Sequence, residues 1–286
     1  DSASQPMKAQ NGRFVLTYNG EIYNYVELKR QLEKLGHVFF STSDTEVVLN
    51  SLIEWGVEAI PKFNGMFSFA FFDRSTKELI IARDRYGIKP LYYYSSNSKL
   101  IFASEQKAIS HVYEHSTKLD YQGFVEYLTF QNIFTDRTLN RDIQILKPGH
   151  YLKVNGANGN LEHYQYWDYD FSEKIDGSDE ELEEELLRLF EQAVKRQLAS
   201  DVEVGSYLSG GIVSGSIAAI AAIENTSLKT FTCGFDLKSA SGLELAYDER
   251  AQASMISDYI GSEQYEMVLK SGDMERCFQR LVHAIE

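Results

Sequence analysis

The sequence predicts two consecutive domains, an α+β first half and an α/β second half with a parallel sheet. The chain has 286 residues, which is enough for two domains of ordinary size. In the first half, β-rich segments alternate with turns and helical segments, whereas the second half runs helix, strand, helix, strand. An acidic stretch from Phe171 to Glu185 marks the boundary, so we place the domains at residues 1–170 and 171–286.

Composition limits the kind of partner. With 43% hydrophobic and 13% aromatic residues, the chain can bury substantial cores. Its net charge of -14 argues against nucleic acid, because phosphate contacts need clustered Lys and Arg. No apolar run is long enough to span a bilayer, and no signal peptide is recognisable. Cys233 and Cys277 form neither a disulfide framework nor a zinc motif, which predicts a reducing cytoplasm and small-molecule partners.

The first half begins with a predicted strand and helix. Arg13 to Tyr18 is apolar and β-rich, and Asn19-Gly20 is a turn signal, so we expect the strand to end there. From Glu21 to Leu32 apolar residues recur at helical spacing, and Gly36 ends the pattern. On these residues alone, the dipeptide is a hairpin-type turn and Glu21 is a charge near a helix start.

The rest of the first half contains further predicted elements. They are a helix at Tyr121 to Tyr127, strands at Ile143 to Leu146 and His150 to Val154, and a hairpin tip at Asn155 to Asn160. Arg83-Asp84-Arg85 follows a β-rich segment, and we interpret it as an ion-paired strand end. His150 and His163 are isolated in the sequence, which favours structural roles over metal binding.

The second half begins with a helix that carries its own start signal. Ser178 and Glu181 have the spacing of a capping box. An apolar face follows at helical spacing, with charged residues opposite, and comprises Leu182, Leu186, Leu189, Phe190 and Ala193. The acidic run is therefore a solvated helix face and requires no basic partner.

A glycine- and serine-rich loop follows the next predicted strand. The strand spans Val202 to Leu208, the loop Ser209 to Ser216, a helix starts at Ser216, and a second strand spans Lys229 to Phe235. Such a loop presents backbone N–H groups and a helix N-terminus to an anion, which is typical of phosphate binding. No Lys follows the glycines, so the loop suits pyrophosphate release better than γ-phosphate transfer. The alternative is a helix entry whose serines are caps.

Motifs in both halves resemble one family. The loop is similar to the Ser-Gly-Gly-x-Asp-Ser signature of N-type ATP pyrophosphatases, including the asparagine synthetases. The first half resembles the glutaminase domain of the glutamine-hydrolysing asparagine synthetases at Tyr18 to Asn24, Ser43 to Val47, Asn64 to Ala70, Ala82 to Tyr93, Phe102 to Ala108 and Leu146 to Tyr151. The resemblance implies a partial N-terminal-nucleophile αββα sandwich followed by a partial ATP-pyrophosphatase domain, with the chain truncated at both ends.

The resemblance also implies a glutamine site. Asn19 and Gly20 match the family's oxyanion hole, through the side-chain amide and the backbone N–H respectively, and contact glutamine there. Glu21 and Asp44 match the carboxylates that hold the α-ammonium group. The family's nucleophile is an N-terminal cysteine, whereas residue 1 here is Asp, so the chain as written is expected to lack glutaminase activity.

In the second half the resemblance implies an ATP site. The residues that match it, for pyrophosphate or adenosine, are Leu208, Ser209, Gly210, Gly211, Ser214 and Cys233. Val213 stands where the family has an Asp that helps hold Mg²⁺, and valine offers no oxygen ligand. The metal ligands are therefore unknown. Asp248-Glu249 matches a family pair, or alternatively suits the positive end of a helix.

The implied reaction is the ATP-dependent conversion of aspartate to asparagine, with Mg²⁺. Ammonia released from glutamine is channelled to aspartyl-AMP. A cytoplasmic enzyme is expected, and a homodimer is compatible with the resemblance. Two alternatives stay open: a related amidotransferase acting on another carboxylate, and a catalytically impaired paralogue that binds nucleotide or glutamine.

Overall fold

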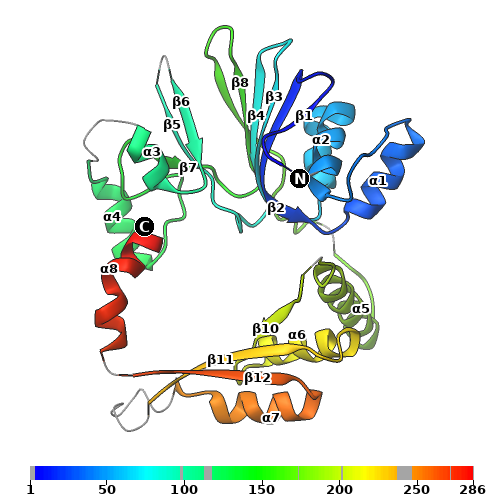
Figure 1. The fold of residues 1–286 in the computed structure, drawn as a ribbon, viewed down its shortest axis with the longest axis vertical. Helices are drawn as coiled ribbons and strands as arrows, with labels where there is room; N and C mark the ends of the chain where they lie inside the picture. Colours follow the sequence, from blue (N-terminus) through cyan, green and yellow to red (C-terminus); the bar gives the residue numbers. More distant parts are fainter. Residues whose placement is uncertain are drawn as a thin grey trace. The chain divides into compact units, whose positions relative to one another are not determined.

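The computed structural model describes residues 4–96, 99–112, 118–172, 174–200, 202–236, 247–270 and 272–285. Asp1 and Glu286, at which the sequence begins and ends, lie outside this range. The chain divides into two compact units at Lys174, and each unit is described by itself (Figure 1). None of the helices in the described ranges is long and apolar enough to cross a membrane.

The first unit is built on a six-stranded antiparallel sheet. Its strand order is β1 (Met7–Ala9), β2 (Phe14–Ile22), β3 (Gly65–Asp73), β4 (Glu78–Arg83), β8 (His150–Asn155) and β9 (Leu161–Gln165). The longest pairing joins β2 to β3, from Phe14 opposite Asp73 to Ile22 opposite Gly65. Strand β2 is thus paired with β3 along its whole length, whereas on its other edge β1 pairs only with Phe14 to Leu16, and the residues beyond Leu16 extend past β1.

Helices cover one face of this sheet and a second sheet covers the other. The helices are α1 (Tyr25–Lys34) and α2 (Asp44–Trp55), followed by the 3-10 helix η1 (Gly56–Lys62), and they share one core with β2 and β3. The second sheet has the order β6 (Leu100–Ala103), β5 (Tyr92–Ser95), β7 (Gln144–Ile145). Its Leu91, Tyr93 and Leu146 pack on Ile81 and Leu152 of the first sheet.

A further helix completes the layers. Helix α3 (Gln106–Val112) packs beside β5 and β6, and α4 (Tyr121–Phe130) follows (Figure 1). The order helix, sheet, sheet, helix confirms the predicted αββα sandwich. The predicted helix from Tyr121, the strands around Ile143 and His150, and the hairpin between β8 and β9 are also confirmed.

The second unit is a small parallel sheet with helices, as predicted. Strands β10 (Gly205–Tyr207), β11 (Lys229–Phe235) and β12 (Glu263–Leu269) pair in parallel in that order. The helices are α5 (Asp179–Gln197), α6 (Ile212–Glu224), α7 (Arg250–Ile260) and α8 (Asp273–Ile285). The core combines Val194, Leu208, Ala218, Ile220, Ala221, Leu228 and Ala253.

The predicted turn at Asn19-Gly20 is wrong, because β2 continues through it to Ile22 and α1 begins only at Tyr25. The physical reason is a close approach of strands. A Cβ at Gly20 would lie 2.3 Å from the carbonyl oxygen of Met66. Glycine is therefore needed here for contact with β3 rather than for a turn.

Two predicted element boundaries and one predicted helix face in the second unit also differ from the structure. The strand before the loop covers only Gly205–Tyr207, and α6 begins at Ile212 instead of Ser216, with Gly211 as N-cap. The capping box of Ser178 is confirmed. The predicted apolar face of α5 is largely solvent-facing, since Leu186 is 69% exposed, and the buried position is Val194. The helix packs through its last turns, where Phe190 and Leu198 accompany Val194.

The segment Arg83-Asp84-Arg85 has a structural role, but the predicted ion pairing is wrong. The Arg83 guanidinium donates to the carbonyl oxygens of Lys89, Leu146 and Gly87, at 2.8, 2.7 and 2.6 Å. The Asp84 carboxylate accepts from four backbone N–H groups, those of Phe67, Tyr86, Ile88 and Lys89. These two charged side chains hold the turn after β4 through its backbone groups, as buried polar groups need hydrogen-bond partners.

Candidate functional site

The edge of β2 beyond β1 carries a cluster of polar contacts. Gln5 reaches Tyr18 with both ends of its side-chain amide: Nε2 donates to the Tyr18 carbonyl at 2.7 Å, and Oε1 accepts the Tyr18 N–H at 2.6 Å. Four residues further along the same edge, the Ile22 N–H donates to the Asp44 carboxylate at 3.0 Å. Side chains thus occupy the backbone positions that a neighbouring strand would otherwise pair with.

Gly20 lies midway between these two contacts. Successive N–H groups of a strand alternate in direction, so the Gly20 N–H points to the same edge as those of Tyr18 and Ile22. The Tyr23 N–H, of opposite parity, donates to Asn64 on the β3 side at 2.8 Å, which agrees with this alternation. The edge therefore presents a backbone donor between Gln5 and Asp44.

Asp44 is the first residue of α2, and the helix start fixes its position. Ser43 is the N-cap, and its hydroxyl accepts the Thr45 N–H at 3.1 Å. Tyr18, buried below β2, donates its hydroxyl to Asp44 Oδ2 at 2.6 Å. Sequence reasoning missed Tyr18, since a tyrosine in an apolar strand signals only a core position.

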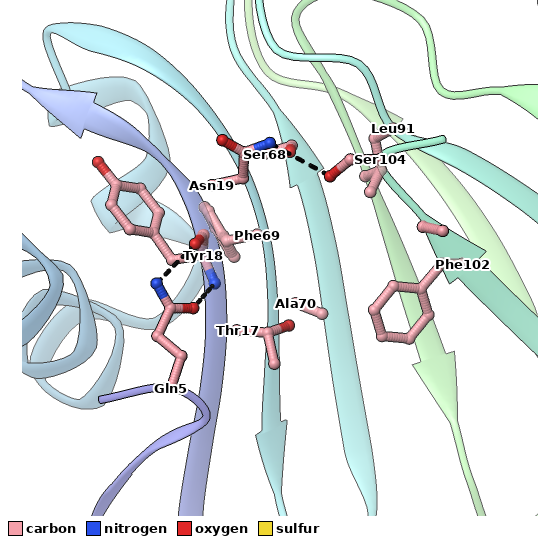
Figure 2. A pocket seen from close by; sticks show the side chains of 11 residues that line it. Gln5, Thr17, Tyr18, Asn19, Ser68, Phe69, Ala70, Leu91, Phe102 and Ser104 are labelled. Atoms are coloured by element: carbon pink, nitrogen blue, oxygen red, sulfur yellow. Dashed lines mark hydrogen bonds between the residues drawn. The ribbon is translucent and has the colours of Figure 1, made fainter. Parts of the chain in front are cut away.

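Asn19 faces a cavity of about 250 Å³ between the two sheets of the first unit (Figure 2). Its Nδ2 donates to the Ser104 hydroxyl at 3.2 Å. The cavity is lined by Gln5, Thr17, Tyr18, Asn19, Ser68, Phe69, Ala70, Leu91, Phe102, Ala103 and Ser104. An amide nitrogen has two N–H groups, so the bond to Ser104 leaves one for a bound group.

Glu21 follows on the same strand and is half-buried. Burial, followed by the charges of Asp44 and Glu21, raises the pKa of the Tyr18 hydroxyl far above its usual range. Burial, followed by the charges of Glu21 and Asp84, also raises the pKa of Tyr23. Both carboxylates therefore act electrostatically on the same buried tyrosine. The structure thus places Asp44 at the β2 edge that carries Gly20 and places Glu21 near the same tyrosine, whereas of these residues Asn19 alone lines the cavity described above.

Together these groups suit a small molecule with both a cation and a polar carbonyl. Asn19 and Gly20 offer N–H donors for an oxygen that gains negative charge. Glu21 and Asp44 offer carboxylates for an ammonium group. Neither cysteine of the sequence lies in this unit, because Cys233 and Cys277 belong to the second.

In the second unit, the loop between β10 and α6 is closed by two serines. Ser209 N–H donates to Ser214 Oγ at 3.1 Å, the two hydroxyls lie 2.8 Å apart, and the Gly211 N–H donates to Ser209 Oγ at 3.2 Å. Gly210 packs against α7, since a Cβ there would lie 2.6 Å from Gln252 Cβ. The loop keeps small residues in front of the α6 N-terminus, and a helix N-terminus suits a phosphate group. The Ser209 and Gly211 N–H groups themselves are bonded within the loop.

The other predicted nucleotide residues lie at the sheet. Leu208 is buried directly after β10, and its N–H donates to the Phe231 carbonyl at 2.9 Å. Its own carbonyl accepts the Thr232 hydroxyl at 2.8 Å. Cys233 is exposed on β11. Leu208 thus lies beside the loop, whereas the Cys233 side chain is on the solvent side of the sheet.

Val213 is the second residue of α6 and is 68% exposed. It provides no oxygen for a divalent cation, so Mg²⁺ does not fit this position. Within the described ranges, no group of three or more His, Cys, Asp or Glu could hold a metal ion. Asp248, near the start of α7, is instead paired with Arg250 at 2.6 Å. Hydrogen bonds from Arg250 lower the Asp248 pKa to about 2.

Comparison with known proteins gives a match in each half. Residues 1–167 match the family described as "Glutamine amidotransferase domain", and residues 185–286 match "Asparagine synthase". "Asparagine synthetase [glutamine-hydrolyzing] 1" of Bacillus subtilis is 33% identical over 93% of this chain and 42% of its own length. "Asparagine synthetase [glutamine-hydrolyzing] 3" of the same organism is 37% identical over 78% of this chain and 36% of its own length.

A relative with a different name is similarly close. "Amidase chry2" of Gibberella zeae is 32% identical over 91% of this chain and 40% of its own length. The chain therefore spans less than half the length of each of these three relatives.

Proposed function

The chain belongs to the glutamine-hydrolysing asparagine synthetase family, and from this premise we propose that it is part of a glutamine-dependent amidotransferase that makes asparagine from aspartate. One observation supports this most: a glutamine amidotransferase segment and an asparagine synthase segment follow each other in one chain. The first unit supplies ammonia from glutamine, and the second activates the acceptor carboxylate with ATP.

In the first unit, glutamine binds at the β2 edge. Glu21 and Asp44 hold its α-ammonium group. When the side-chain amide carbon becomes tetrahedral, its oxygen gains negative charge and accepts hydrogen bonds from Asn19 Nδ2 and the Gly20 N–H. Loss of one such donor typically costs about 10²–10³ in rate. The nucleophilic step is assigned to no residue of this chain.

In the second unit, the loop holds the ATP phosphates. The Gly210 N–H and the first N–H groups of α6 face the pyrophosphate, while the Gly211 N–H stays bonded to the Ser209 hydroxyl. Leu208 and Cys233 contribute to the adenosine side. The aspartate side-chain carboxylate attacks the α-phosphorus, which forms aspartyl-AMP and releases pyrophosphate. Ammonia then attacks the acyl carbon, and AMP departs as asparagine forms. No step is assigned to Mg²⁺, because Val213 offers it no ligand.

The synthetase reaction is tested by aspartate-dependent exchange of labelled pyrophosphate into ATP. We would use the protein at its full encoded length, with Mg²⁺ in the buffer. Exchange that requires aspartate supports the proposal. Absence of exchange with aspartate but exchange with another carboxylate would transfer the proposal to that acceptor.

The glutamine site is tested separately. In the protein at its full encoded length, Asp44→Ala or Glu21→Ala should raise the KM for glutamine in glutamine hydrolysis, because the ammonium group loses a charged partner worth about 1.5–3 kcal/mol. Glu162→Ala, on β9, is a control outside the proposed site. An unchanged KM in both site variants would remove these carboxylates from the site.

Two alternative functions each have one specific observation in their favour. Another carboxylate acceptor is the first candidate, because one relative, "Amidase chry2", is not named as an asparagine synthetase. The exposed Val213 favours a protein that binds glutamine or nucleotide without full turnover. Val213→Asp separates this last candidate: we expect exchange to rise at least tenfold if the valine limits the reaction, and Val213→Asn controls for polarity without charge. Equal pyrophosphate exchange in the parent, Val213→Asp and Val213→Asn proteins would show that the valine does not limit the reaction.

A further inference from the structure

We propose that Tyr18 is a positioning residue for the glutamine site: its hydroxyl anchors one carboxylate oxygen of Asp44 and leaves the other directed at the ligand's ammonium group. The inference rests on the proposed binding of glutamine by the first unit. It adds to that proposal a residue from the core, which the sequence motifs assign to no role.

The hydrogen bonds of Asp44 are divided unequally between its two oxygens. Oδ2 accepts both the Tyr18 hydroxyl at 2.6 Å and the Ile22 N–H at 3.0 Å. Oδ1 has one contact among the described residues, with the Thr45 hydroxyl at the long distance of 3.5 Å. One oxygen is thus saturated by short bonds, while the other keeps its acceptor capacity for a ligand.

Tyr18 is well suited to hold a carboxylate still. Its side chain is 8% exposed and belongs to the core between the large sheet and α1 and α2. Its backbone is fixed on both sides of the residue by the Gln5 amide (Figure 2). A buried ring has few rotamers available, so the hydroxyl position is set by packing. The Tyr18 hydroxyl is therefore already ordered before a ligand binds, so little conformational entropy is lost on binding.

The tyrosine also stays in the state that the anchor requires. Burial and the neighbouring carboxylate charges raise its pKa, so the hydroxyl remains protonated and donates at neutral pH. Donation to an ionised acceptor gives a bond shorter and stronger than a neutral one. Removal of this donor would leave the Ile22 N–H as the remaining donor to Oδ2, so the carboxylate would rotate more easily about its last torsion, which is broad for aspartate.

A purely structural role for Tyr18 predicts something different. The ring fills the core, so its loss would lower stability without a specific effect on glutamine. Electrostatics alone even predicts the opposite sign, because a carboxylate that loses a donor attracts an ammonium group more strongly. A weaker affinity for glutamine in a stable Tyr18→Phe protein would therefore distinguish a positioning role from a purely structural role and from a purely electrostatic effect.

The test measures the dissociation constant of L-glutamine by titration calorimetry, with the protein at its full encoded length. Tyr18→Phe keeps the ring and removes only the hydroxyl. Tyr166→Phe is the matched control, because it removes another part-buried hydroxyl of the same unit, bonded to the Arg83 carbonyl at 2.8 Å. Asp44→Ala and the double variant Tyr18→Phe with Asp44→Ala complete a thermodynamic cycle.

We expect Tyr18→Phe to weaken glutamine binding about tenfold, equivalent to about 1.4 kcal/mol, and Tyr166→Phe to leave it within twofold. In the Asp44→Ala background, Tyr18→Phe should add less than twofold. An unchanged or tighter dissociation constant in Tyr18→Phe would overturn the inference, as would an additive double variant. If Asp44→Ala also binds normally, or if the parent protein binds no glutamine, the proposed function fails as well.

Discussion

Gly20→Ala tests whether close contact between β2 and β3 is what requires a glycine beside Asn19. The added Cβ would lie 2.3 Å from the Met66 carbonyl oxygen, 2.7 Å from Phe67 Cα and 2.9 Å from Phe67 Cβ. The first two atoms are backbone, so no side-chain rotation relieves the clash. The strands must move apart at the point where Gly20 is paired with Phe67.

The magnitude follows from that geometry. Real Cβ contacts are essentially never below 3.0 Å, so the 2.3 Å contact must lengthen by about 0.7 Å. Overpacking typically costs about 1–3 kcal/mol, and a clash with backbone belongs at the upper end. For a unit of this size, about 3 kcal/mol corresponds to a fall in Tm of about 6–12 °C.

The assay is differential scanning calorimetry of the unit's transition. Gly177→Ala, in the second unit, is the control for the change from glycine to alanine and is read on that unit's own transition, because its nearest neighbour is a flexible glutamate oxygen at 3.4 Å. We expect the control to melt within about 1 °C of the parent, or slightly higher through its less flexible unfolded chain. A Gly20→Ala protein that melts within about 2 °C of the parent would refute the close-contact explanation.

Two further predictions concern charged residues of the first unit. Asp120 caps α4 and accepts the Gly123 and Gln122 N–H groups, which with Arg137 lower its pKa; Asp120→Ala should cost about 1–2 kcal/mol in urea unfolding at pH 7. A lowered pKa contributes its full stability above the unfolded value of about 3.9 and loses it as the pH falls toward the folded pKa. The difference in unfolding free energy between the parent and Asp120→Ala should therefore shrink below pH 4, and a difference independent of pH would contradict the assignment. Arg83, 7% exposed, donates to three carbonyl groups, so Arg83→Met should cost about 3 kcal/mol or more by the same measurement, and a loss below about 1 kcal/mol would contradict it.

Local signals were sufficient for much of the fold. The capping box of Ser178 and the strand Lys229–Phe235 are found where the sequence predicted them, and the hairpin tip after Asn155 joins β8 to β9. Each depends on residues within a few positions of one another, whose spacing fixes caps, turns and alternation. The order of strand and helix likewise predicted the parallel sheet of the second unit.

Where the sequence prediction failed, a distant segment decided the outcome. Asn19-Gly20 has the composition of a turn, yet pairing with β3, more than forty residues later, keeps it in a strand. The apolar face of α5 shows correct helical spacing, but only the part that meets α6, around Val194, is buried. Spacing states which residues share a face and leaves open what that face contacts.

The sequence by itself determined the family, the order of the two halves and the residue types of the candidate site. The tertiary structure alone decided that the edge of β2 joins these residues, with Gln5 and Asp44 on either side of the Gly20 N–H. It also joined Tyr18 to Asp44, 26 residues apart. The physical reason is that a hydrogen bond depends on distance and direction in space, and local spacing encodes neither for residues on different elements.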